Sequence, residues 1–466
     1  MKAEKTLFKC ATLCSVLFVF AFGAQSNYGT FWHVTDFHYD HTYMTSQLSC
    51  VKGVNNPSIL GNEWCDSPWS LVTKTINAMK TLHSDVDFLL WTGDTVAHIS
   101  NDKMNITINM DVMANLTKAM NDAFPDKKVY ATFGNHDYYP ASQFPAVSNL
   151  IYNETAELWK QWIEEEEQLK YFRRGGYYTR LLPPNNKVRI VALNTNLYYT
   201  SDKVTVNETD PTGQLQWMRL VLQLAKNNSE KVILAAHIPP GIHTPRGVQW
   251  FQDKFVQPFN SIVKDFADVI KAMHFGHDHY DGFKVFDDNS GQPAIPLFVA
   301  PSVTPWRFIL NEKVTGSPHN PAIRLVTYDR DTGDHVDIQQ YRMDLSASLP
   351  QGDGNFTLLY SFTERYKVKD ISATSLASLI TRMSAEAEGD DLLNTYFNFT
   401  LTGAQFESCD RTCKTRILCG FRHYTSAEFN KCERDNSDAS GTGSRVAAPT
   451  LFIFLVALLS LLRQRS

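Results

Sequence analysis

Gly134-Asn135-His136-Asp137 follows the apolar run Val129–Thr132, and this junction decides how the rest of the chain is interpreted. A short apolar run of this kind is typical of a buried strand. The polar residues would then stand at the carboxyl end of a strand, the edge of an α/β sheet where ligands bind. Asn and His side chains can bind a divalent cation, but an isolated Asn-His-Asp is usually a turn. Alone, the stretch leaves both interpretations open.

Two earlier segments repeat this arrangement. Asp36-Phe37-His38 follows the apolar run Gly29–Val34. Alternate residues at a strand end point the same way, so Asp36 and His38 can reach one cation. Gly93-Asp94 follows the run Phe88–Trp91, and the two oxygens of one carboxylate can bridge two ions.

Two later segments complete the set. His237 follows the apolar run Val232–Ala236, and Gly276-His277-Asp278-His279 follows Met273–Phe275. A single buried histidine is more often structural than metal-binding, and a lone His-x-His is also weak evidence. Five such segments in this order, each after a strand, predict a site for two divalent metals.

The pattern between these segments predicts an α/β fold. Two more strands are expected at Val188–Leu193 and Leu297–Val299. Amphipathic periodicity predicts helices between the strands, at Trp69–Leu82, Ile108–Ala123, Thr155–Gln168 and Gln214–Lys226. Alternating strands and helices favour a layered α/β domain, which we place at residues 24–350.

The character of the chain changes after about residue 350. Residues 365–432 lack strand-like runs, and helices are expected at Ser372–Glu386 and Asp390–Phe397. We expect residues 351–436 to form a small helical subdomain stapled by disulfides.

Both ends carry targeting signals. Residues 1–23 combine lysines, a short apolar run and small residues, which favours a cleaved signal peptide over a retained anchor. In residues 437–466, small residues precede an apolar stretch, which favours a GPI-anchor signal. Arg463 and Arg465 after that stretch keep a transmembrane span open as the alternative.

Six cysteines remain once the signal peptide is removed, and an even number in an oxidising compartment predicts three disulfides. Closing short loops costs least entropy, so we expect the pairs Cys50–Cys65, Cys409–Cys413 and Cys419–Cys432. A zinc knuckle in the last four cysteines is disfavoured because it lacks paired CxxC spacing.

Seven N-x-Ser/Thr sequons predict a glycosylated, solvent-facing exterior: Asn105, Asn115, Asn153, Asn207, Asn227, Asn355 and Asn398. The formal net charge of -5 and the absence of a long basic run argue against a nucleic-acid polymer as partner. Nothing in the sequence predicts an oligomeric state.

The ordered metal-binding set resembles the calcineurin-like metallophosphoesterases. Within them the chain resembles the acid sphingomyelinase-like phosphodiesterases over about residues 28–432. That narrower resemblance rests on segments of similar amino-acid sequence: Phe31-Trp32-His33, Cys65-Asp66-Ser67-Pro68-Trp69, Trp91-Thr92-Gly93-Asp94, Leu193–Tyr199, His237-Ile238-Pro239-Pro240-Gly241 and Ser302–Trp306. The resemblance implies an α/β sandwich of two mixed sheets flanked by helices, and its GPI-anchored members match the hydrophobic tail.

The resemblance also implies a ligand set. Asp36, His38 and His279 would bind one metal. Asn135, His237 and His277 would bind the other, with Asp94 bridging the two. Four imidazoles favour zinc over magnesium, and the family implies zinc as well. Ala97 stands where purple acid phosphatases carry a tyrosine, so a phenolate-bound ferric iron is not supported.

The same likeness makes His136 and His98 the candidates for general acid catalysis. We favour His136 as the proton donor and His98 as an orienting or phosphate-contacting residue. A histidine near its unperturbed pKa is suited to protonate the leaving alkoxide in acidic media. An exposed loop histidine is the alternative for His98.

Three functions remain open. Too few residues precede Phe31 for the saposin domain of acid sphingomyelinase, so the first hypothesis is a phosphodiesterase or diphosphatase acting on small nucleotide or choline-nucleotide substrates. The second is a lipid phosphodiesterase acting on sphingomyelin-like headgroups at the membrane. The third is a membrane-organising or receptor-modulating protein with dispensable catalysis, which the complete metal set argues against.

Overall fold

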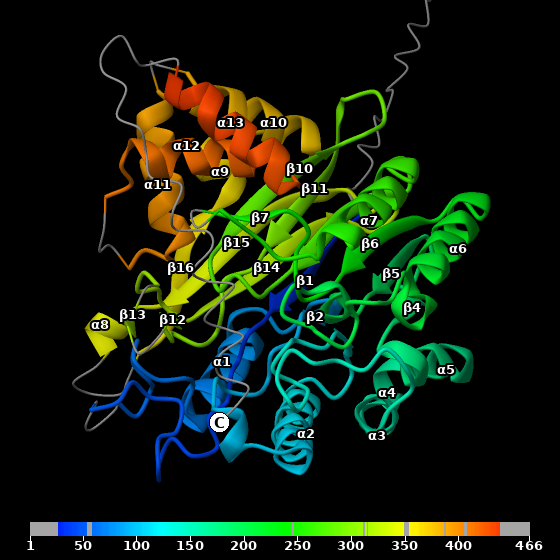
Figure 1. Cartoon of the computed structure of the whole chain (residues 1–466), viewed down its shortest axis with the longest axis vertical. Helices are drawn as coiled ribbons and strands as arrows, with labels where there is room; N and C mark the ends of the chain where they lie inside the picture. Colours follow the sequence, from blue (N-terminus) through cyan, green and yellow to red (C-terminus); the bar gives the residue numbers. More distant parts are fainter. Residues whose placement is uncertain are drawn as a thin grey trace, which may run out of the picture.

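Two six-stranded mixed sheets form the centre of the molecule, with helices on their outer faces (Figure 1). This computed structural model describes residues 27–438 except 54–57, 245–246, 311–312, 315, 349–353, 386–387 and 405–407. The predicted signal peptide and the tail from residue 439 lie outside the described residues. The predicted α/β sandwich of two mixed sheets flanked by helices is confirmed.

The first sheet has the order β16-β15-β14-β1-β2-β3. Its strands are β1 (Tyr28–Val34), β2 (Phe88–Trp91), β3 (Lys128–Ala131), β14 (Ala322–Asp329), β15 (His335–Met343) and β16 (Phe356–Ser361). Strands β1, β2 and β3 are parallel, so their carboxyl ends share one edge. The other neighbours in the sheet pair antiparallel.

The second sheet has the order β10-β11-β9-β6-β5-β4. Its strands are β4 (Tyr178–Leu181), β5 (Val188–Ala192), β6 (Lys231–Ala235), β9 (Ile270–Phe275), β10 (Gly282–Asp287) and β11 (Pro293–Val299). Strands β5, β6, β9 and β11 are parallel and the two edge strands are antiparallel. Two short ribbons pair β7 (Ile242–His243) with β8 (Val248–Gln249) and β12 (Ile309–Leu310) with β13 (Lys313–Val314).

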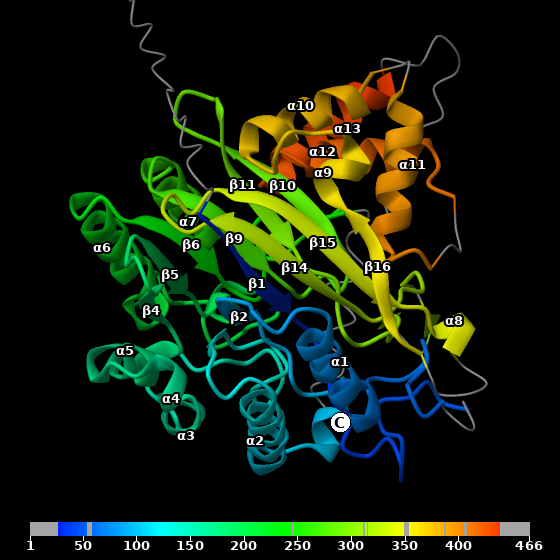
Figure 2. The same cartoon turned by 180° about the vertical axis from the view of Figure 1, so that it is seen from behind.

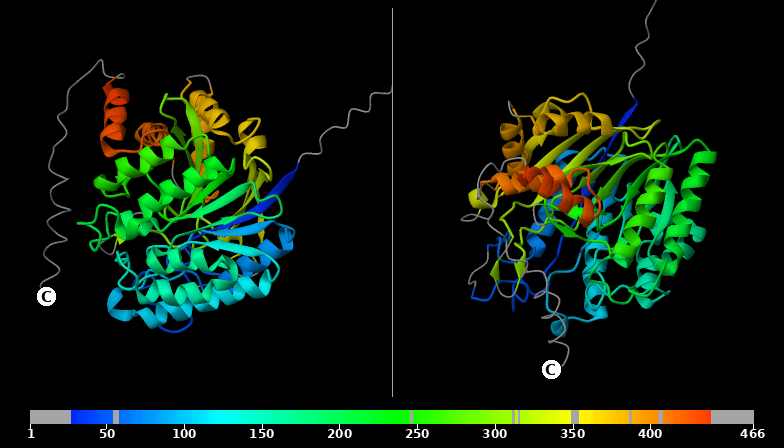
Figure 3. Two further views of the ribbon diagram at one scale, coloured as in Figure 1. Left: turned by 90° about the vertical axis from the view of Figure 1, so that its right-hand side faces the viewer. Right: turned by 45° about the horizontal axis from the view of Figure 1, so that its top comes forward.

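Helices cover both outer faces of the sandwich, as the edge-on view shows (Figure 3). The helices of the first three hundred and fifty residues are α1 (Trp69–Leu82), α2 (Ile106–Ala123), α3 (Leu150–Leu158), α4 (Lys160–Ile163), α5 (Glu166–Gly175), α6 (Gln214–Asn227), α7 (Asp253–Asp265) and α8 (Leu345–Ser348). In α1 the buried side chains Leu71, Val72, Ile76 and Met79 recur at helical spacing and form the face that packs on the core.

One predicted helix was wrong. The stretch Thr155–Gln168 is not continuous, because α3 ends at Leu158 and a further break separates α4 from α5. At that break Glu164 has a left-handed backbone with φ 59°, which no α-helix accommodates. Its carboxylate pairs with Lys128 and, at 3.0 Å, with Arg180. These tertiary contacts hold the turn where the apolar periodicity alone predicts a longer helix.

The C-terminal region is helical, as predicted. It contains α9 (Phe362–Tyr366), α10 (Ala373–Met383), α11 (Gly389–Thr400), α12 (Arg411–Gly420) and α13 (Ser426–Asp438), which gather beside β10 and β11 in the rear view (Figure 2). The three predicted disulfides are present, and Cys419–Cys432 joins α12 to α13. Strand β16 lies beyond residue 350 and still pairs with β15, while the predicted domain boundary stays a prediction.

Apolar side chains from both sheets meet in one core that includes Phe31, Leu90, Ile233 and Phe275, all fully buried. Within residues 27–438 as described, no helix is both long and apolar enough to cross a membrane.

Candidate metal centre

All seven predicted metal ligands lie at one edge of the sandwich. The loops that follow β1, β2 and β3 carry Asp36, His38, Asp94 and Asn135, and the loops after β6 and β9 carry His237, His277 and His279. The carboxyl ends of parallel strands point to the same edge, so segments spread over more than two hundred residues converge there.

One half of the cluster surrounds the imidazole of His38. Its Nε2 lies 3.1 Å from His279 Nε2, 3.4 Å from Asp94 Oδ2 and 3.6 Å from Asp36 Oδ1. The Nε2 of His279 is 3.4 Å from the same Asp36 oxygen. These atoms are the ligands predicted for one metal together with the bridging carboxylate.

The other half surrounds the imidazole of His237. Its Nε2 lies 3.1 Å from Asp94 Oδ2 and 3.2 Å from Asn135 Oδ1. Ligand atoms, one each from Asp94, His237 and His277, lie within 4.8 Å of one another. Asp94 therefore contributes to both halves, which is the position that a bridging carboxylate requires.

The arrangement fits two divalent cations because hydrogen bonds behind the ligands fix their orientation. His38 Nδ1 donates to Val96 O at 2.8 Å, and His237 Nδ1 donates to Thr92 O at 2.7 Å. Each carbonyl accepts a proton from Nδ1 and so directs Nε2 of the same ring toward the carboxylates. Asp36 Oδ1 is fully buried and has no hydrogen-bond partner in the part of the chain that the structure describes. A buried carboxylate oxygen without a donor is well explained by a cation.

The backbone at the ligands is strained. Asp36, His38, Asp94, His277 and His279 all have positive φ, between 41° and 70°. Left-handed backbone at residues other than glycine costs energy and clusters at functional sites. The left-handed conformation turns these five side chains toward the cluster at the ends of their strands.

Two glycines allow the loops after β2 and β3 to touch. A Cβ on Gly93 would lie 2.3 Å from the backbone nitrogen of Gly134. A Cβ on Gly134 would lie 2.1 Å from Asp94 N and Asp94 Oδ1. Only glycine fits at either position, and the contact brings Asn135 up to Asp94.

Electrostatics at the cluster favour positive charge. Burial would lower the pKa of His38 and of His237, but the carboxylates of Asp94 and Asp36 raise both to about 9. Burial likewise opposes ionisation of Asp94, yet His237 and His38 hold its pKa well below the ordinary range. The site is therefore built to stabilise cations.

A cavity of about 160 Å³ opens beside the ligands. Asp94, Asn135, His277 and His279 contribute to its lining, and so do both predicted general-acid candidates, His98 and His136. Aromatic side chains form much of the remaining wall, namely Tyr199, Trp250, Tyr280, Trp306 and Phe308. A phosphate ester entering this cavity would meet the ligands and both histidines together.

Both candidate acids are half-buried and lie against the ligands. The backbone N–H of His136 donates to Asp94 Oδ1 at 2.8 Å, and burial lowers the pKa of its imidazole to about 4. Burial and the neighbouring imidazoles of His38 and His136 hold the pKa of His98 well below its ordinary value. Because an anion favours the charged imidazolium, a bound phosphate ester would raise both pKa values.

Sequence reasoning gave no role to two carboxylates that hold this site. Asp137 accepts hydrogen bonds from the backbone N–H groups of Asp94, Thr95 and Gly134, and burial raises its pKa to about 6. Asp66 accepts hydrogen bonds from His98. Both residues belong to motifs that the sequence analysis quotes. The motifs indicate that the residues lie near the site, but they do not indicate which hydrogen bonds the two carboxylates accept.

Most of the predicted glycosylation sites are exposed to solvent. Six of the seven sequon asparagines are exposed, and Asn398 in α11 is half-buried. Asn105 also caps α2, since its side chain accepts a hydrogen bond from Ile108 N. Attachment of glycans stays a prediction.

Comparison with known families agrees with this geometry. Residues 29–281 match the model of the calcineurin-like phosphoesterases. Residues 292–438 match the C-terminal region of acid sphingomyelin phosphodiesterase. The first match spans every predicted metal ligand.

Individual relatives align over nearly the whole chain. The acid sphingomyelinase-like phosphodiesterase 3b of Homo sapiens is 37% identical over 94% of this chain and 96% of its own length. The cyclic GMP-AMP phosphodiesterase SMPDL3A of Homo sapiens is 33% identical over 87% and 90% respectively. The sphingomyelinase phosphodiesterase C of Dictyostelium discoideum is 30% identical over 87% and 92%. The chain therefore belongs to the acid sphingomyelinase-like phosphodiesterases, metal-dependent phosphoric diester hydrolases of the calcineurin-like phosphoesterase family.

Proposed function

We propose that this protein is a dizinc phosphodiesterase that hydrolyses phosphodiester or diphosphate bonds of small nucleotide or choline-nucleotide substrates at the cell surface. The observation that carries the proposal is the convergence of seven ligand side chains on one buried cluster. Asp36, His38 and His279 would hold one ion and Asn135, His237 and His277 the other, with Asp94 between them. Four imidazoles in the set favour zinc.

The side chains around the cluster divide the remaining work. When bound, the two ions supply the charge that polarises a phosphoryl group and activates water. His136 is held beside Asp94 by its backbone, and its ring reaches the cavity, where it can give a proton to the leaving oxygen. His98 stands next to it, with the ring centroids 4.3 Å apart, and can contact the same phosphate.

The cavity supports a small polar substrate. Its aromatic wall offers ring faces on which a nucleobase can stack, and the same faces attract a quaternary ammonium group such as choline. Relatives named cyclic GMP-AMP phosphodiesterases support the nucleotide side of the proposal. Relatives named sphingomyelin phosphodiesterases support the second candidate, a lipid phosphodiesterase acting on the choline headgroup.

Direct competition separates the two candidates. The zinc-loaded protein would be given a cytidine diphosphate–choline conjugate, a cyclic dinucleotide and sphingomyelin vesicles at equal phosphodiester concentration. We expect kcat/KM to be highest on one of the two nucleotide substrates. A preference for vesicle sphingomyelin would refute the nucleotide proposal and establish the lipid one.

A GPI anchor at the extracellular surface is the location that we propose. It rests on the small residues and apolar stretch of residues 437–466 and is supported by three disulfides, which persist in oxidising compartments. Phosphatidylinositol-specific phospholipase C should release the protein from intact cells. Retention on the cells after that treatment would instead favour a transmembrane span.

A further inference from the structure

We infer that Asp66 is a positioning residue for His98: it holds the ring proton of the imidazole on Nδ1 and so presents Nε2 to the cavity. The inference deepens the proposed phosphodiesterase function and rests on it for its catalytic consequence. The geometry that carries it is independent of any metal.

Asp66 is fully buried and its carboxylate is directed at His98. Asp66 Oδ2 accepts a hydrogen bond from the backbone nitrogen of His98 at 2.6 Å, and both carboxylate oxygens lie 3.1 Å from His98 Nδ1. Thr304 Oγ1 donates to Asp66 Oδ1 at 3.0 Å. A carboxylate can only accept hydrogen bonds, so the backbone N–H of His98, the hydroxyl of Thr304 and Nδ1 of His98 must all act as donors. Nδ1 must therefore carry the ring proton, and the carboxylate selects this tautomer.

Stacking fixes the plane of the ring. His98 lies between the imidazole of His38, with centroids 4.0 Å apart and an angle of 28°, and the indole of Trp306, at 3.9 Å and 11°. A ring sandwiched on both faces can only move within its plane, and the bond to Asp66 prevents that movement. The side chain is 17% exposed, and His98 belongs to the cavity lining. With Nδ1 engaged, Nε2 is the atom left to contact substrate.

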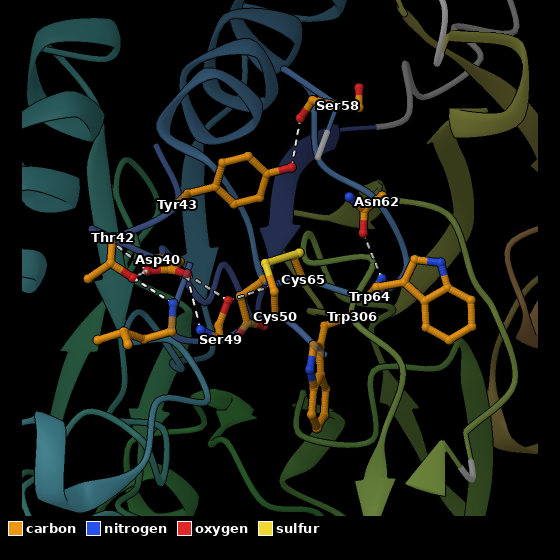
Figure 4. Close-up of a disulfide and its surroundings, with 12 residues drawn as sticks. Asp40, Thr42, Tyr43, Ser49, Cys50, Ser58, Asn62, Trp64, Cys65 and Trp306 are labelled. Carbon is orange, nitrogen blue, oxygen red and sulfur yellow. Dashed lines mark hydrogen bonds between the residues drawn. A yellow bond between two sulfur atoms is a disulfide. The ribbon is translucent and has the colours of Figure 1, made fainter. Parts of the chain in front are cut away.

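Asp66 itself is anchored beside the Cys50–Cys65 disulfide. Figure 4 shows this disulfide with Ser49 and Asp40 next to it. The backbone N–H of Asp66 donates to Ser49 Oγ at 3.1 Å, and that hydroxyl donates to Asp40 Oδ2 at 2.7 Å. The disulfide joins the residues next to Ser49 and Asp66. A rigid support behind a ligand-contacting side chain is what precise placement needs.

Asp66→Asn is the sharpest perturbation because it keeps the shape and changes one acceptor into a donor. The amide NH2 is itself a donor, and it would have to face one of the three groups that donate to Asp66. If it faces His98 Nδ1, that nitrogen must accept the hydrogen bond, and the ring proton moves to Nε2. We expect kcat on bis(4-nitrophenyl) phosphate to fall by about tenfold or more, with KM changed less than about twofold, because the metal centre that would bind the phosphate is unchanged. Asp87→Asn is the matched control, since Asp87 is hydrogen bonded to Tyr328 and Arg330 at the opposite end of β2.

A double-mutant cycle distinguishes positioning from general damage. If Asp66 acts through His98, adding Asp66→Asn to His98→Ala should lower kcat no further. A full additional loss in the His98→Ala background would overturn the inference.

The tautomer is measured directly by long-range 1H–15N spectra of the full-length protein labelled on histidine nitrogen, with His98 assigned from the signal lost in His98→Ala. We expect a protonated Nδ1 in the wild-type protein and a protonated Nε2 in Asp66→Asn. A bare Nδ1 in the wild-type protein would refute the assignment without any variant having to fold. Because this readout needs no turnover, a wild-type protein that cleaves no diester would refute the proposed function and leave the spectra to decide on Asp66.

Discussion

At the scale of single residues, the centre depends on side chains forced into place by costly backbone conformations. Five of the predicted ligands have left-handed backbone, and glycine at 93 and 134 lets two ligand loops touch. Such strain persists only where the surroundings enforce it. Substituting a ligand side chain tests metal binding, whereas substituting one of the two glycines tests the fold of the ligand loops.

Asp94→Asn tests the bridging position. An amide keeps the size of the side chain but offers one neutral oxygen in place of a shared charge. We expect phosphodiesterase activity and zinc affinity to fall by more than the roughly 10- to 100-fold that loss of an outer hydrogen-bond partner costs. Metal analysis after dialysis measures the affinity. Two tightly held zinc ions per chain in the variant would contradict a bridging Asp94.

Gly93→Ala tests the close contact between the ligand loops. The new methyl group would meet the backbone of Gly134 at 2.3 Å, in addition to the strain of φ 91°. We expect the free energy of unfolding to drop by about 3 kcal/mol or more. Gly291→Ala is the control: its φ is 80°, and nothing lies within 4 Å of the added Cβ. A similar loss in both variants would mean that backbone strain, and not the contact, makes Gly93 necessary.

At the scale of elements, polar side chains join the two sheets where they face each other. His33 on β1, His274 on β9 and His335 on β15 form a buried chain of imidazoles. Nitrogens of the first pair lie 3.3 Å apart and those of the second pair 2.8 Å. His335 Nδ1 donates to Gly333 O at 3.0 Å. Protonating this chain would place positive charge between the sheets.

The chain of histidines predicts acid sensitivity. Burial lowers the pKa of His335 from 6.5 to about 4, so between these values the unfolded protein binds more protons than the folded one. Stability is therefore present above pH 6.5 and is lost as the pH falls toward 4. His335→Gln should reduce the difference in unfolding free energy between pH 7.5 and 5 by on the order of 2 kcal/mol. Urea titrations at both pH values measure it, with the exposed His41→Gln as control. An unchanged pH dependence would count against a neutral, buried His335.

An ion pair also crosses between the sheets. Arg324 on β14 pairs with Asp281, two residues after the predicted ligand His279, and Tyr360 on β16 donates to the same carboxylate. Arg324 is 1% exposed. Arg324→Met should destabilise the fold by about 3–5 kcal/mol, because it leaves a buried carboxylate unpaired. The double variant with Asp281→Asn should recover a large part of that loss in denaturant melts. No recovery would show that Asp281 is not the group left uncompensated.

At the scale of the whole molecule, the sequence predicted the strands that lead into the candidate centre better than the other strands of the two sheets. The ligand segments could be recognised because each follows an apolar strand, and all seven strands expected from such runs are present. Strands β10 and β14 were missed because Lys284 and Arg324 interrupt their apolar pattern. Those cations are buried only because the rest of the chain supplies partners: Ile242 O and Gly420 O for Lys284, and Asp281 for Arg324. Strand β15 was missed because its polar residues bury little apolar surface.

We propose that two metal ions in this cluster make the protein a phosphodiesterase. The most direct test is hydrolysis of bis(4-nitrophenyl) phosphate by the purified protein before chelation, after chelation and after zinc is returned, with bound zinc counted at each step. We expect activity to disappear with the metal and to return in proportion to zinc, reaching its maximum at two ions per chain. Full activity in the metal-free protein, or a folded protein with two zinc ions and no diesterase activity, would contradict the proposal.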